Sequence, residues 1–516
     1  MRAAIYDKFW RSMGGGERHC GMIAQLLSQS GTEVDLIGHQ RVSLQELGDR
    51  LALDLSKVSL VVTPDRGEKA LSDLSADYDL FVNATYMSRV IPRSARSAYL
   101  CFFPTPEGHD LSALHRAAIH YVGPRLGEQR AHQDITYGTG WFPPEGGRRR
   151  QWAWSGGKAV IHFAPGESLE IAADFGRPGS TDTVTADVEL DGETLASFPV
   201  GPVFTTRVIS VPASPRRREL HLSSPTFTPG PDDPRQLGVA MSRLRLVGTK
   251  RTVRTRVADR YPWLLRDLHD ISFVEAYDLI LANSAYTQQW IKRLWRTDSE
   301  ILFPPIEVSK IAPSPQRQKT ILSVGRFMPP GHGHSKRQME IVRTFGQLVR
   351  SGALTDWKLV VLGGCEPRHR PYLDAVRKAA SGLPVEIHAN APRALVESHM
   401  STASIFWSAT GLGEDTEKRP WTNEHFGMTT AEAMVGGCTP VVIDRAGQQE
   451  IVRDGVDGFR WNTVEEWRIR TVQVATDEAL RARLAASAIE RVQQFSDDAF
   501  ALRWNDLAAT YDLMGP

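Results

Sequence analysis

Two carboxylates of the sequence, Glu424 and Glu432, stand with seven residues between them. The segment between them resembles the start of a helix, whose first backbone amides are free to bind a phosphate group. In such a site Glu432, one to two turns into the helix, could accept hydrogen bonds from vicinal ribose hydroxyls, while Glu424 projects from the loop toward a sugar. The residues expected at the helix start are Phe426, Gly427, Met428 and Thr429. The alternative is an acidic helix start that complements the helix dipole, with Glu432 on a solvated surface.

Two cations favour the first of these interpretations. Arg326 follows an apolar run that predicts a strand at 320–324, and Lys336 precedes the next predicted helix. The carboxyl ends of parallel strands form the usual ligand-binding edge of an open α/β sheet. Two cations at that edge can stabilise a departing diphosphate without a metal ion or an added proton. The carboxylates and cations together therefore predict a phosphate-ester site that needs no metal.

Three histidines are further candidates. His109 lies in a Glu-Gly-His-Asp loop, where a histidine is either solvated or reaches a neighbouring site. His332 and His334 flank a glycine, but no carboxylate or thiolate stands near them in the sequence. Because zinc sites usually combine several such ligands, we expect a flexible loop that closes over the site rather than a metal site.

These residues must be positioned by α/β elements. Near the start of the chain an apolar run at 3–6 is followed by three glycines, a helical stripe of apolar residues that stops at Gly31, and an apolar run at 34–37. This order predicts strand, glycine loop, helix and strand, the start of a parallel sheet whose first helix points its N-terminus at an anion. Gly15 and Gly16 are two of the three glycines of this loop.

The middle of the chain has a different pattern. Apolar residues alternate with other residues at 169–175 and 184–190, and the turn Asp191-Gly192 closes the second run. The α/β pattern returns with a predicted strand at 276–282, after which Asn283-Ser284 predicts a helix cap. We therefore expect an antiparallel β-sandwich that is inserted into the first α/β domain.

Four aromatic residues near the start of the predicted sandwich have two interpretations. Exposed tryptophans can stack on sugar rings, whereas tryptophan beside strands more often belongs to the core. The four residues are Trp141, Phe142, Trp152 and Trp154. We favour the core interpretation.

The remaining segments complete the organisation. A proline-containing stretch of low apolar content at 309–318 predicts a linker, and alternating strand and helix patterns follow it. The later predicted strands lie at 358–362, 385–388, 404–407 and 440–443, and the tail at 477–513 is predicted to be helical. The expected units are an N-terminal α/β domain at 1–133 and 251–308, the sandwich at 134–250, the linker at 309–318, a C-terminal α/β domain at 319–495 and a returning C-terminal helix at 496–516.

Composition excludes several kinds of partner and location. Lys and Arg number 61 against 60 Asp and Glu, so a net charge of +1 gives no field that would attract nucleic acid. The four cysteines lie far apart without a CxxC pair, which argues against disulfides and structural zinc and favours a reducing cytosol. No uncharged run approaches the ~20 residues that span a bilayer.

The motifs together resemble a known family, the retaining nucleotide-sugar glycosyltransferases of family 4 (glycosyl transferases group 1). Their GT-B fold places two Rossmann-like domains on either side of a cleft. The matching segments, in family order, are Gly14 to Arg18, Ala282 to Trp290, Leu302 to Pro305, Val324 to Phe327, His334 to Lys336 and Glu424 to Glu432. Within the family they look most like the mannosyltransferases that extend lipid-linked oligosaccharides. The inserted sandwich resembles those of bacterial glycosyltransferases of surface-polysaccharide pathways.

The resemblance implies a role for each matching residue. Arg326 and Lys336 would bind the donor diphosphate, Glu432 the ribose and Glu424 the donor-sugar hydroxyls, with the two glycines of the N-terminal loop across the cleft. The donor would be a nucleotide diphosphate sugar, GDP-mannose first and UDP-sugars next. The acceptor would be a glycan or a lipid-linked glycan, and the anomeric configuration would be retained. No metal or other cofactor is implied.

A basic segment with an aromatic end is a candidate for membrane contact. It contains Lys250, Arg251, Arg254, Arg256, Arg260 and Trp263. Such a patch can rest on an anionic membrane that carries a lipid-linked acceptor, and the alternative is a solvated linker face. The expected location is the cytoplasm, with at most peripheral contact to the inner face of the cytoplasmic membrane.

The sequence departs from the family pattern at one place. The family often has a histidine after a middle strand of the N-terminal domain, where this chain has Phe102 and Phe103. His109 is the candidate replacement. Two other functions stay open, a glycoside hydrolase that uses Glu424 and Glu432 as acid and nucleophile, and a non-catalytic glycan-binding protein on a degenerate transferase scaffold.

Overall fold

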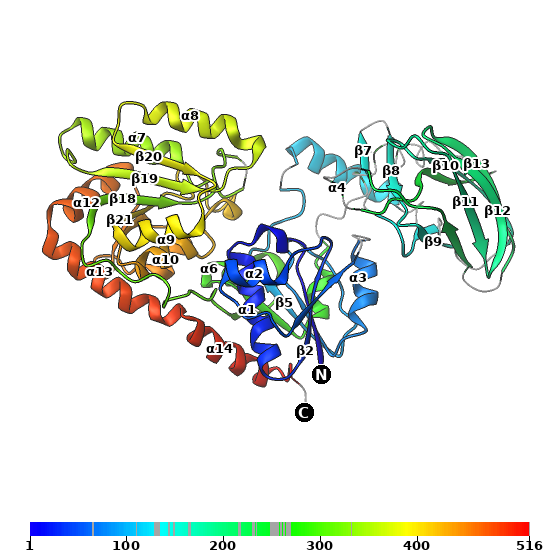
Figure 1. Ribbon diagram of the computed structural model, residues 1–516, viewed down its shortest axis with the longest axis horizontal. Helices are drawn as coiled ribbons and strands as arrows, with labels where there is room; N and C mark the ends of the chain where they lie inside the picture. Colours follow the sequence, from blue (N-terminus) through cyan, green and yellow to red (C-terminus); the bar gives the residue numbers. More distant parts are fainter. Residues whose placement is uncertain are drawn as a thin grey trace.

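The chain folds into two parallel α/β units and a β-sandwich, which lie side by side with the first α/β unit in the middle (Figure 1). The computed structural model describes residues 1–63, 67–109, 111–127, 135–142, 145–147, 150–163, 167–214, 218–229, 233, 235–247, 257, 261, 264, 270–331 and 333–514. The basic segment of Lys250, Arg251, Arg254, Arg256, Arg260 and Trp263 lies outside these residues, as does His332.

The first unit is built on a parallel sheet of seven strands in the order β17-β16-β5-β4-β1-β2-β3. Its strands are β1 (Arg2–Tyr6), β2 (Glu33–Gly38), β3 (Val58–Val62), β4 (Leu80–Asn83), β5 (Arg96–Cys101), β16 (Leu279–Ala282) and β17 (Glu300–Ile301), and its helices are α1 (Gly15–Gln29), α2 (Leu44–Leu51), α3 (Glu68–Ser75) and α6 (Ala285–Trp295). The strand predicted at 276–282 begins only at Leu279, because Ser272–Ala276 form a 3-10 turn. The central strands are almost fully buried, as expected where helices cover both faces of a parallel sheet.

The sandwich is inserted between two neighbouring strands of this sheet. β5 and β16 pair in parallel, and helix α4 (Ala113–Gly127) and all the sandwich strands lie between them in the sequence. The two antiparallel sheets have the orders β13-β10-β15-β8-β7 and β12-β11-β14-β9-β6. Their strands are β6 (Ile135–Tyr137), β7 (Glu145–Gly147), β8 (Arg150–Trp154), β9 (Lys158–Phe163), β10 (Leu169–Gly176), β11 (Val184–Leu190), β12 (Glu193–Val200), β13 (Thr205–Val211), β14 (Arg218–Ser223) and β15 (Ala240–Leu246).

The aromatic residues at the start of the sandwich belong to its interior. Trp141 and Trp154 are 2% and 3% exposed. Phe142 and Trp152 are partly buried against the small cluster that contains Trp154. The core interpretation of these residues is therefore confirmed, and they do not form an exposed sugar-stacking platform.

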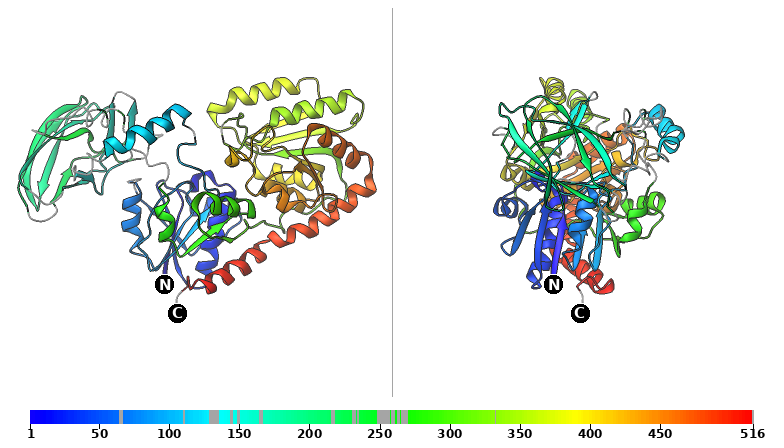
Figure 2. Two further views of the ribbon diagram at one scale, coloured as in Figure 1. Left: turned by 180° about the vertical axis from the view of Figure 1, so that it is seen from behind. Right: turned by 90° about the vertical axis from the view of Figure 1, so that its right-hand side faces the viewer.

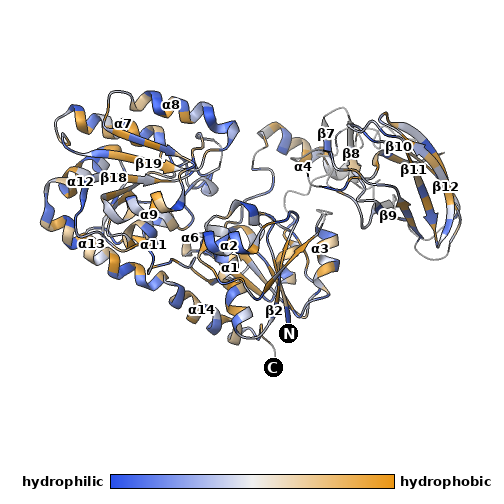
Figure 3. Ribbon diagram, in the orientation of Figure 1, coloured by the Kyte–Doolittle hydropathy of each residue, from blue (hydrophilic) through white to orange (hydrophobic). Residues whose placement is uncertain are grey.

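The second α/β unit contains a parallel sheet of six strands in the order β20-β19-β18-β21-β22-β23. Its strands are β18 (Gln318–Val324), β19 (Lys358–Gly363), β20 (Val385–Ala389), β21 (Ala403–Ser408), β22 (Thr439–Ile443) and β23 (Phe459–Trp461), and its helices are α7 (Gln338–Arg350), α8 (Arg370–Ala380), α9 (Arg393–Thr402), α10 (Met428–Val435), α11 (Gln448–Ile451) and α12 (Val464–Thr476). Figure 3 shows strongly apolar residues on the strands and hydrophilic ones along the outer helix α8. The segment before β18 packs on this unit, since Ile311 is buried and the Ser314 amide donates to the Ser401 carbonyl.

The last helices connect the two α/β units. Helix α13 (Glu478–Val492) packs on α10 and β22, and after a short 3-10 turn α14 (Asp497–Thr510) reaches the first unit (Figures 1 and 2). Phe500 and Trp504 of α14 are buried in the same core as α1 and β2. Arg18 of α1 forms an ion pair with Asp497 at 2.7 Å. Within the described residues, no helix combines the length and apolarity that a membrane span requires.

Candidate active site

A glycine makes the bend from which helix α10 starts. Gly427, the residue before α10, has φ +117°, and an added Cβ would lie 3.0 Å from Gln448 Nε2 and 3.1 Å from Ile451 Cδ1. Glycine is therefore the residue that fits this position without strain. Met428 and Thr429 are the first two residues of α10, so their backbone amides have no carbonyl acceptor within the helix. Together with the helix dipole they favour an anion at this end of α10.

An ion pair between Lys336 and Glu424 lies beside this helix start. The Lys336 ammonium contacts Glu424 Oε2, and both side chains are largely buried. Thr410 Oγ1 donates a second hydrogen bond to Glu424 Oε2 at 3.2 Å. Burial alone would raise the pKa of the Glu424 carboxyl, but the Lys336 charge outweighs it and holds that pKa below its usual range. Glu424 is therefore a carboxylate at neutral pH.

Two partly buried histidines lie near this carboxylate. Burial lowers the pKa of His334 to about 3 and that of His425 to about 4, with the Lys336 charge acting in the same direction. Their ring centroids lie 5.4 Å apart, and the His425 ring stacks on Phe103 of the first unit at 4.4 Å. Both imidazoles are therefore neutral at pH 7, so each can donate one hydrogen bond and accept another.

Arg326 lines a small pocket at the carboxyl ends of β18 and β19. The pocket has a volume of about 170 Å³, and its lining residues are Arg326, Phe327, Met328, Gly364, Cys365, Glu366, His369 and Asn390. The Arg326 side chain is exposed, and its charge acts on His334, so it lies within electrostatic reach of the Lys336–Glu424 pair. The two predicted cations thus approach the same edge of the sheet.

Two residues predicted for donor binding have other partners in the structure. The Glu432 carboxylate accepts a hydrogen bond from Arg393 of α9 at 2.9 Å. The Phe426 ring is 3% exposed and packs against Phe303 and Phe495 in the core. The apolar Phe426 ring therefore anchors the bend before α10 in the core, and donor binding by the residues at this helix start stays a prediction.

The N-terminal glycine loop meets the start of α10. Helix α1 begins at Gly15, and a Cβ added there would overlap Met428 Sδ. A Cβ added to Gly16 would contact the Phe102 ring at 3.4 Å. A side chain at position 15 would therefore require the Met428 side chain to move. The structure therefore brings both predicted helix starts, α1 and α10, to the same place.

His109 also lies at the boundary between the two units. Its ring approaches Trp421 edge-on, with centroids 5.4 Å apart, and its Nδ1 lies 3.2 Å from the Pro106 carbonyl oxygen. Trp421 belongs to the loop 409–427 between β21 and α10. His109 thus faces the loop that carries Glu424, although no hydrogen bond between the two is present among the described residues.

The same loop is tied to helix α6 of the first unit. The Tyr286 hydroxyl donates to the Pro420 carbonyl at 2.9 Å, and Arg293 pairs with Glu417 at 2.8 Å. Glu450 of α11 accepts hydrogen bonds from the first two amides of α6, those of Ala285 at 2.7 Å and Tyr286 at 2.9 Å. A carboxylate from one unit therefore caps a helix of the other.

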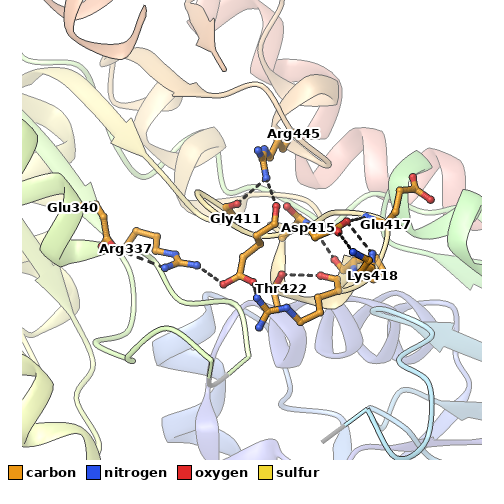
Figure 4. A network of polar contacts seen from close by, with 12 residues as sticks. Arg337, Glu340, Gly411, Asp415, Glu417, Lys418, Thr422 and Arg445 are labelled. Carbon is orange, nitrogen blue, oxygen red and sulfur yellow. Dashed lines mark hydrogen bonds and ion pairs between the residues drawn. The ribbon is translucent and has the colours of Figure 1, made fainter. Parts of the chain in front are cut away.

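A network of arginines fixes the loop that carries Glu424 (Figure 4). The buried Glu414 carboxylate pairs with Arg337 and with Arg419. Arg445 donates to the carbonyl oxygens of Gly411 and Glu414 at 2.9 and 2.7 Å. Because Arg337 directly follows Lys336 in the chain, the network also holds the segment that carries Lys336 against the loop.

Several residues at this boundary were not predicted from the sequence. Arg393, His425 and Glu450 act through tertiary contacts, and their spacing carries no motif of its own. His334 was predicted to lie in a loop that closes over the site, but its position beside Glu424 and His425 was not predicted. One signal was present, since His425 lies inside the motif 424–432.

Comparison with known proteins agrees with this arrangement. Residues 306–491 match the model of the family described as glycosyl transferases group 1. The chain is 27% identical over 242 residues to a GDP-Man:Man(3)GlcNAc(2)-PP-Dol alpha-1,2-mannosyltransferase of Xenopus tropicalis, and this stretch covers 43% of the chain and 46% of the relative. The chain therefore spans about half the length of the curated relatives it matches.

Solved structures are similar over nearly the whole chain. Anabaena Alr3699/HepE in complex with UDP has a TM-score of 0.54 at 12% identity, with 99% of this chain and 100% of that chain covered. Sucrose-phosphate synthase from Thermosynechococcus elongatus has a TM-score of 0.53 at 12% identity, with 99% of both chains covered. At these identities the likeness shows the fold alone. The predicted GT-B fold and the resemblance to glycosyl transferases group 1 are confirmed.

Proposed function

We propose that this protein is a glycosyltransferase that moves a sugar from a nucleotide diphosphate donor to a hydroxyl group of a glycan or lipid-linked glycan. The observation that carries the proposal is the ion pair of Lys336 and Glu424 at the start of α10, with Arg326 at the same sheet edge. This arrangement combines cations, free amides and a carboxylate within the matched segment 306–491. A sugar attached to a diphosphate presents matching groups, because its phosphate oxygens can bind the cations and amides and its hydroxyls can donate hydrogen bonds to the carboxylate.

Each group has a chemical task in this proposal. Arg326, Lys336 and the first amides of α10 bind the diphosphate and stabilise the negative charge that grows as it departs. Glu424, held as a carboxylate, accepts hydrogen bonds from donor-sugar hydroxyls. Glu432 accepts hydrogen bonds from the ribose hydroxyls and is oriented for this by Arg393. Gly15 and Gly16 lie across from the start of α10, where the diphosphate is proposed to bind.

The reaction is proposed to retain the anomeric configuration. The bond between the anomeric carbon and the diphosphate oxygen breaks, and the acceptor oxygen forms its bond to the same face of the sugar. The proton of the acceptor hydroxyl passes to the departing diphosphate. No residue in this scheme requires a metal ion, since Arg326 and Lys336 carry the counter-charge.

The proposed donor is GDP-mannose, with UDP-sugars as the second choice. The first choice is supported by the relatives whose printed names begin with GDP-Man. The second is supported by the similar fold of HepE, which was solved with UDP. A hydrolase that uses both glutamates is not favoured, because Glu424 and Glu432 are each paired with a cation. A glycan-binding role of the sandwich aromatics is not favoured, because these residues are buried or partly buried.

The proposal is tested by release of the nucleotide diphosphate. Native protein is incubated with GDP-mannose and with UDP-sugars, with and without oligosaccharide acceptors, and the freed diphosphate and the product are quantified. We expect release with one base, stimulated by acceptor, and a loss of at least about 100-fold in Glu424→Gln. Glu478→Gln, which changes an exposed carboxylate at the start of α13, is the control and should retain activity. Release that is equal in Glu424→Gln and native protein would contradict the proposal.

A further inference from the structure

A second cluster of chemically active side chains lies on strand β20 and helix α9. Glu386 and His388 are alternate residues of β20, so they point to the same face of the sheet. His399 comes from α9, which follows β20 in the chain. The ligand atoms of the three side chains all lie within 4.8 Å of one another. None of these residues belongs to the site described above.

The distances in this cluster suit a small cation. Zinc bonds to imidazole nitrogen at about 2.0–2.1 Å and to carboxylate oxygen at about 2.0–2.2 Å, so tetrahedral geometry places two ligand atoms about 3.4 Å apart. His388 Nε2 and Glu386 Oε2 already lie 3.5 Å apart. The centroids of the His388 and His399 rings are 5.8 Å apart with a tilt of 34°. An ion therefore requires only a small movement of His399.

The polar contacts of the cluster leave ligand atoms available. His388 Nε2 is buried and makes no hydrogen bond within the described structure. Lys358 donates to Glu386 Oε1 at 3.0 Å, which orients the carboxylate and leaves Oε2 facing His388. Two imidazoles and one carboxylate match the preferences of zinc and its neighbours in the first transition row. They do not match those of Mg²⁺ or Ca²⁺, which prefer oxygen ligands.

We propose that Glu386, His388 and His399 bind a divalent transition-metal ion of the zinc class, with water as a fourth ligand. The ion would join β20 to α9. Because α9 also carries Arg393, which contacts Glu432, the ion would hold in place the helix that orients this glutamate. The proposal concerns metal binding and stability, and it does not depend on the proposed glycosyl transfer.

The test is a calorimetric titration of the full, untagged chain with Zn²⁺ at neutral pH. We expect one equivalent to bind, with a Kd at least about tenfold weaker in each of His388→Gln, His399→Gln and Glu386→Gln, since even outer partners of metal ligands contribute 10–100-fold. His221→Gln on β14 removes an exposed imidazole elsewhere and is the matched control, which should bind like native protein. Mg²⁺ should neither bind nor compete.

Two further measurements separate metal binding from damage to the fold. In the presence of a chelator, the three ligand variants should have melting temperatures within a few degrees of that of native protein. Added Zn²⁺ should raise the melting temperature of native protein and of the His221→Gln control, but not that of the three ligand variants. Bound Co²⁺ should show the strong visible absorption of a tetrahedral site. The proposal would be overturned if His388→Gln and His399→Gln bound Zn²⁺ as tightly as native protein does. It would also be overturned if His221→Gln failed to bind one equivalent of Zn²⁺.

Discussion

Replacement of Lys336 by Met is expected to destabilise the second α/β unit strongly at neutral pH. The Lys336 and Glu424 side chains are only 17% and 15% exposed, so the variant leaves a carboxylate in a poorly solvated place. Removing one partner of a buried ion pair typically costs about 3–5 kcal/mol. Thr410 still donates to the carboxylate, which places the expected loss at the lower end, about 3 kcal/mol.

The pH dependence of this loss follows from the pKa of Glu424. In native protein Lys336 holds the pKa below that of the unfolded chain, so the stabilisation is present above about pH 4.3 and is lost as the pH falls through the folded value. In the variant burial prevails and raises the pKa above about 4.3. The difference between native and variant stability should therefore be largest at neutral pH and shrink as the carboxyl group becomes protonated, by at most about 1.4 kcal/mol per pH unit.

The assay is denaturation of both proteins between pH 4.5 and 8, followed by tryptophan fluorescence, to which the buried Trp407, Trp461 and Trp467 of the second unit contribute. Lys378→Met on the exposed face of α8 is the control and should change stability little. The double variant Lys336→Met/Glu424→Gln should recover part of the loss, because it leaves no uncompensated charge. A Lys336→Met variant as stable as the control at neutral pH, or a loss independent of pH, would refute this reasoning.

Three further predictions concern the glycine before α10, the contact between the two α/β units and the buried histidine His19. Gly427→Ala should lower the free energy of unfolding by about 2 kcal/mol, because Gly427 has a positive φ and close contacts, and it should abolish nucleotide binding. Gly352→Ala, at a positive φ in open space, should lower it by only about 1 kcal/mol and should still bind nucleotide. Calorimetry would measure both effects. Glu450→Gln should weaken the contact between the two α/β units by about 2 kcal/mol, because Glu450 accepts hydrogen bonds from two amides of α6. The radius of gyration measured by solution scattering should increase. A radius equal to that of the control variant Glu490→Gln would contradict this prediction. Burial lowers the pKa of His19 to about 3, so its contribution to stability is present above about pH 6.5 and falls by about 1.4 kcal/mol per unit below it. His19→Leu should flatten the decline of the melting temperature between pH 6.5 and 4, and an unchanged slope would contradict this.

The sequence was sufficient for most of the regular elements. Apolar runs such as 320–324 and 440–443 predicted central strands, because parallel strands are buried on both faces. The period of two at 169–175 and 184–190 predicted the sandwich. Short elements escaped prediction, since β23 has only three residues and its pairing with β22 depends on tertiary structure. The start of β16 was misplaced because the apolar residues before it form a 3-10 turn.

The candidate site was predicted less completely than the fold. The helix start at Gly427 and the cations Arg326 and Lys336 follow from local pattern and from the edge of the sheet to which they belong. The partner of Glu432 could not be predicted from local pattern. Arg393 is 39 positions away in the sequence and contacts Glu432 only because α9 packs beside α10. The burial of the Phe426 ring was not predicted either, because an apolar residue next to a polar motif can lie in the core or at the surface, and tertiary packing decides between them.

The most direct test of the central claim is donor binding by the second α/β unit. The melting temperature of the chain is measured with GDP, UDP and ADP and with their sugar conjugates, for native protein, Arg326→Ala and the exposed control Arg483→Ala. A ligand at a hundredfold excess over its Kd should stabilise the native state by about 2.7 kcal/mol. The account predicts a shift with one base, retained in Arg483→Ala and lost in Arg326→Ala. No shift with any nucleotide, or an equal shift in Arg326→Ala, would contradict it.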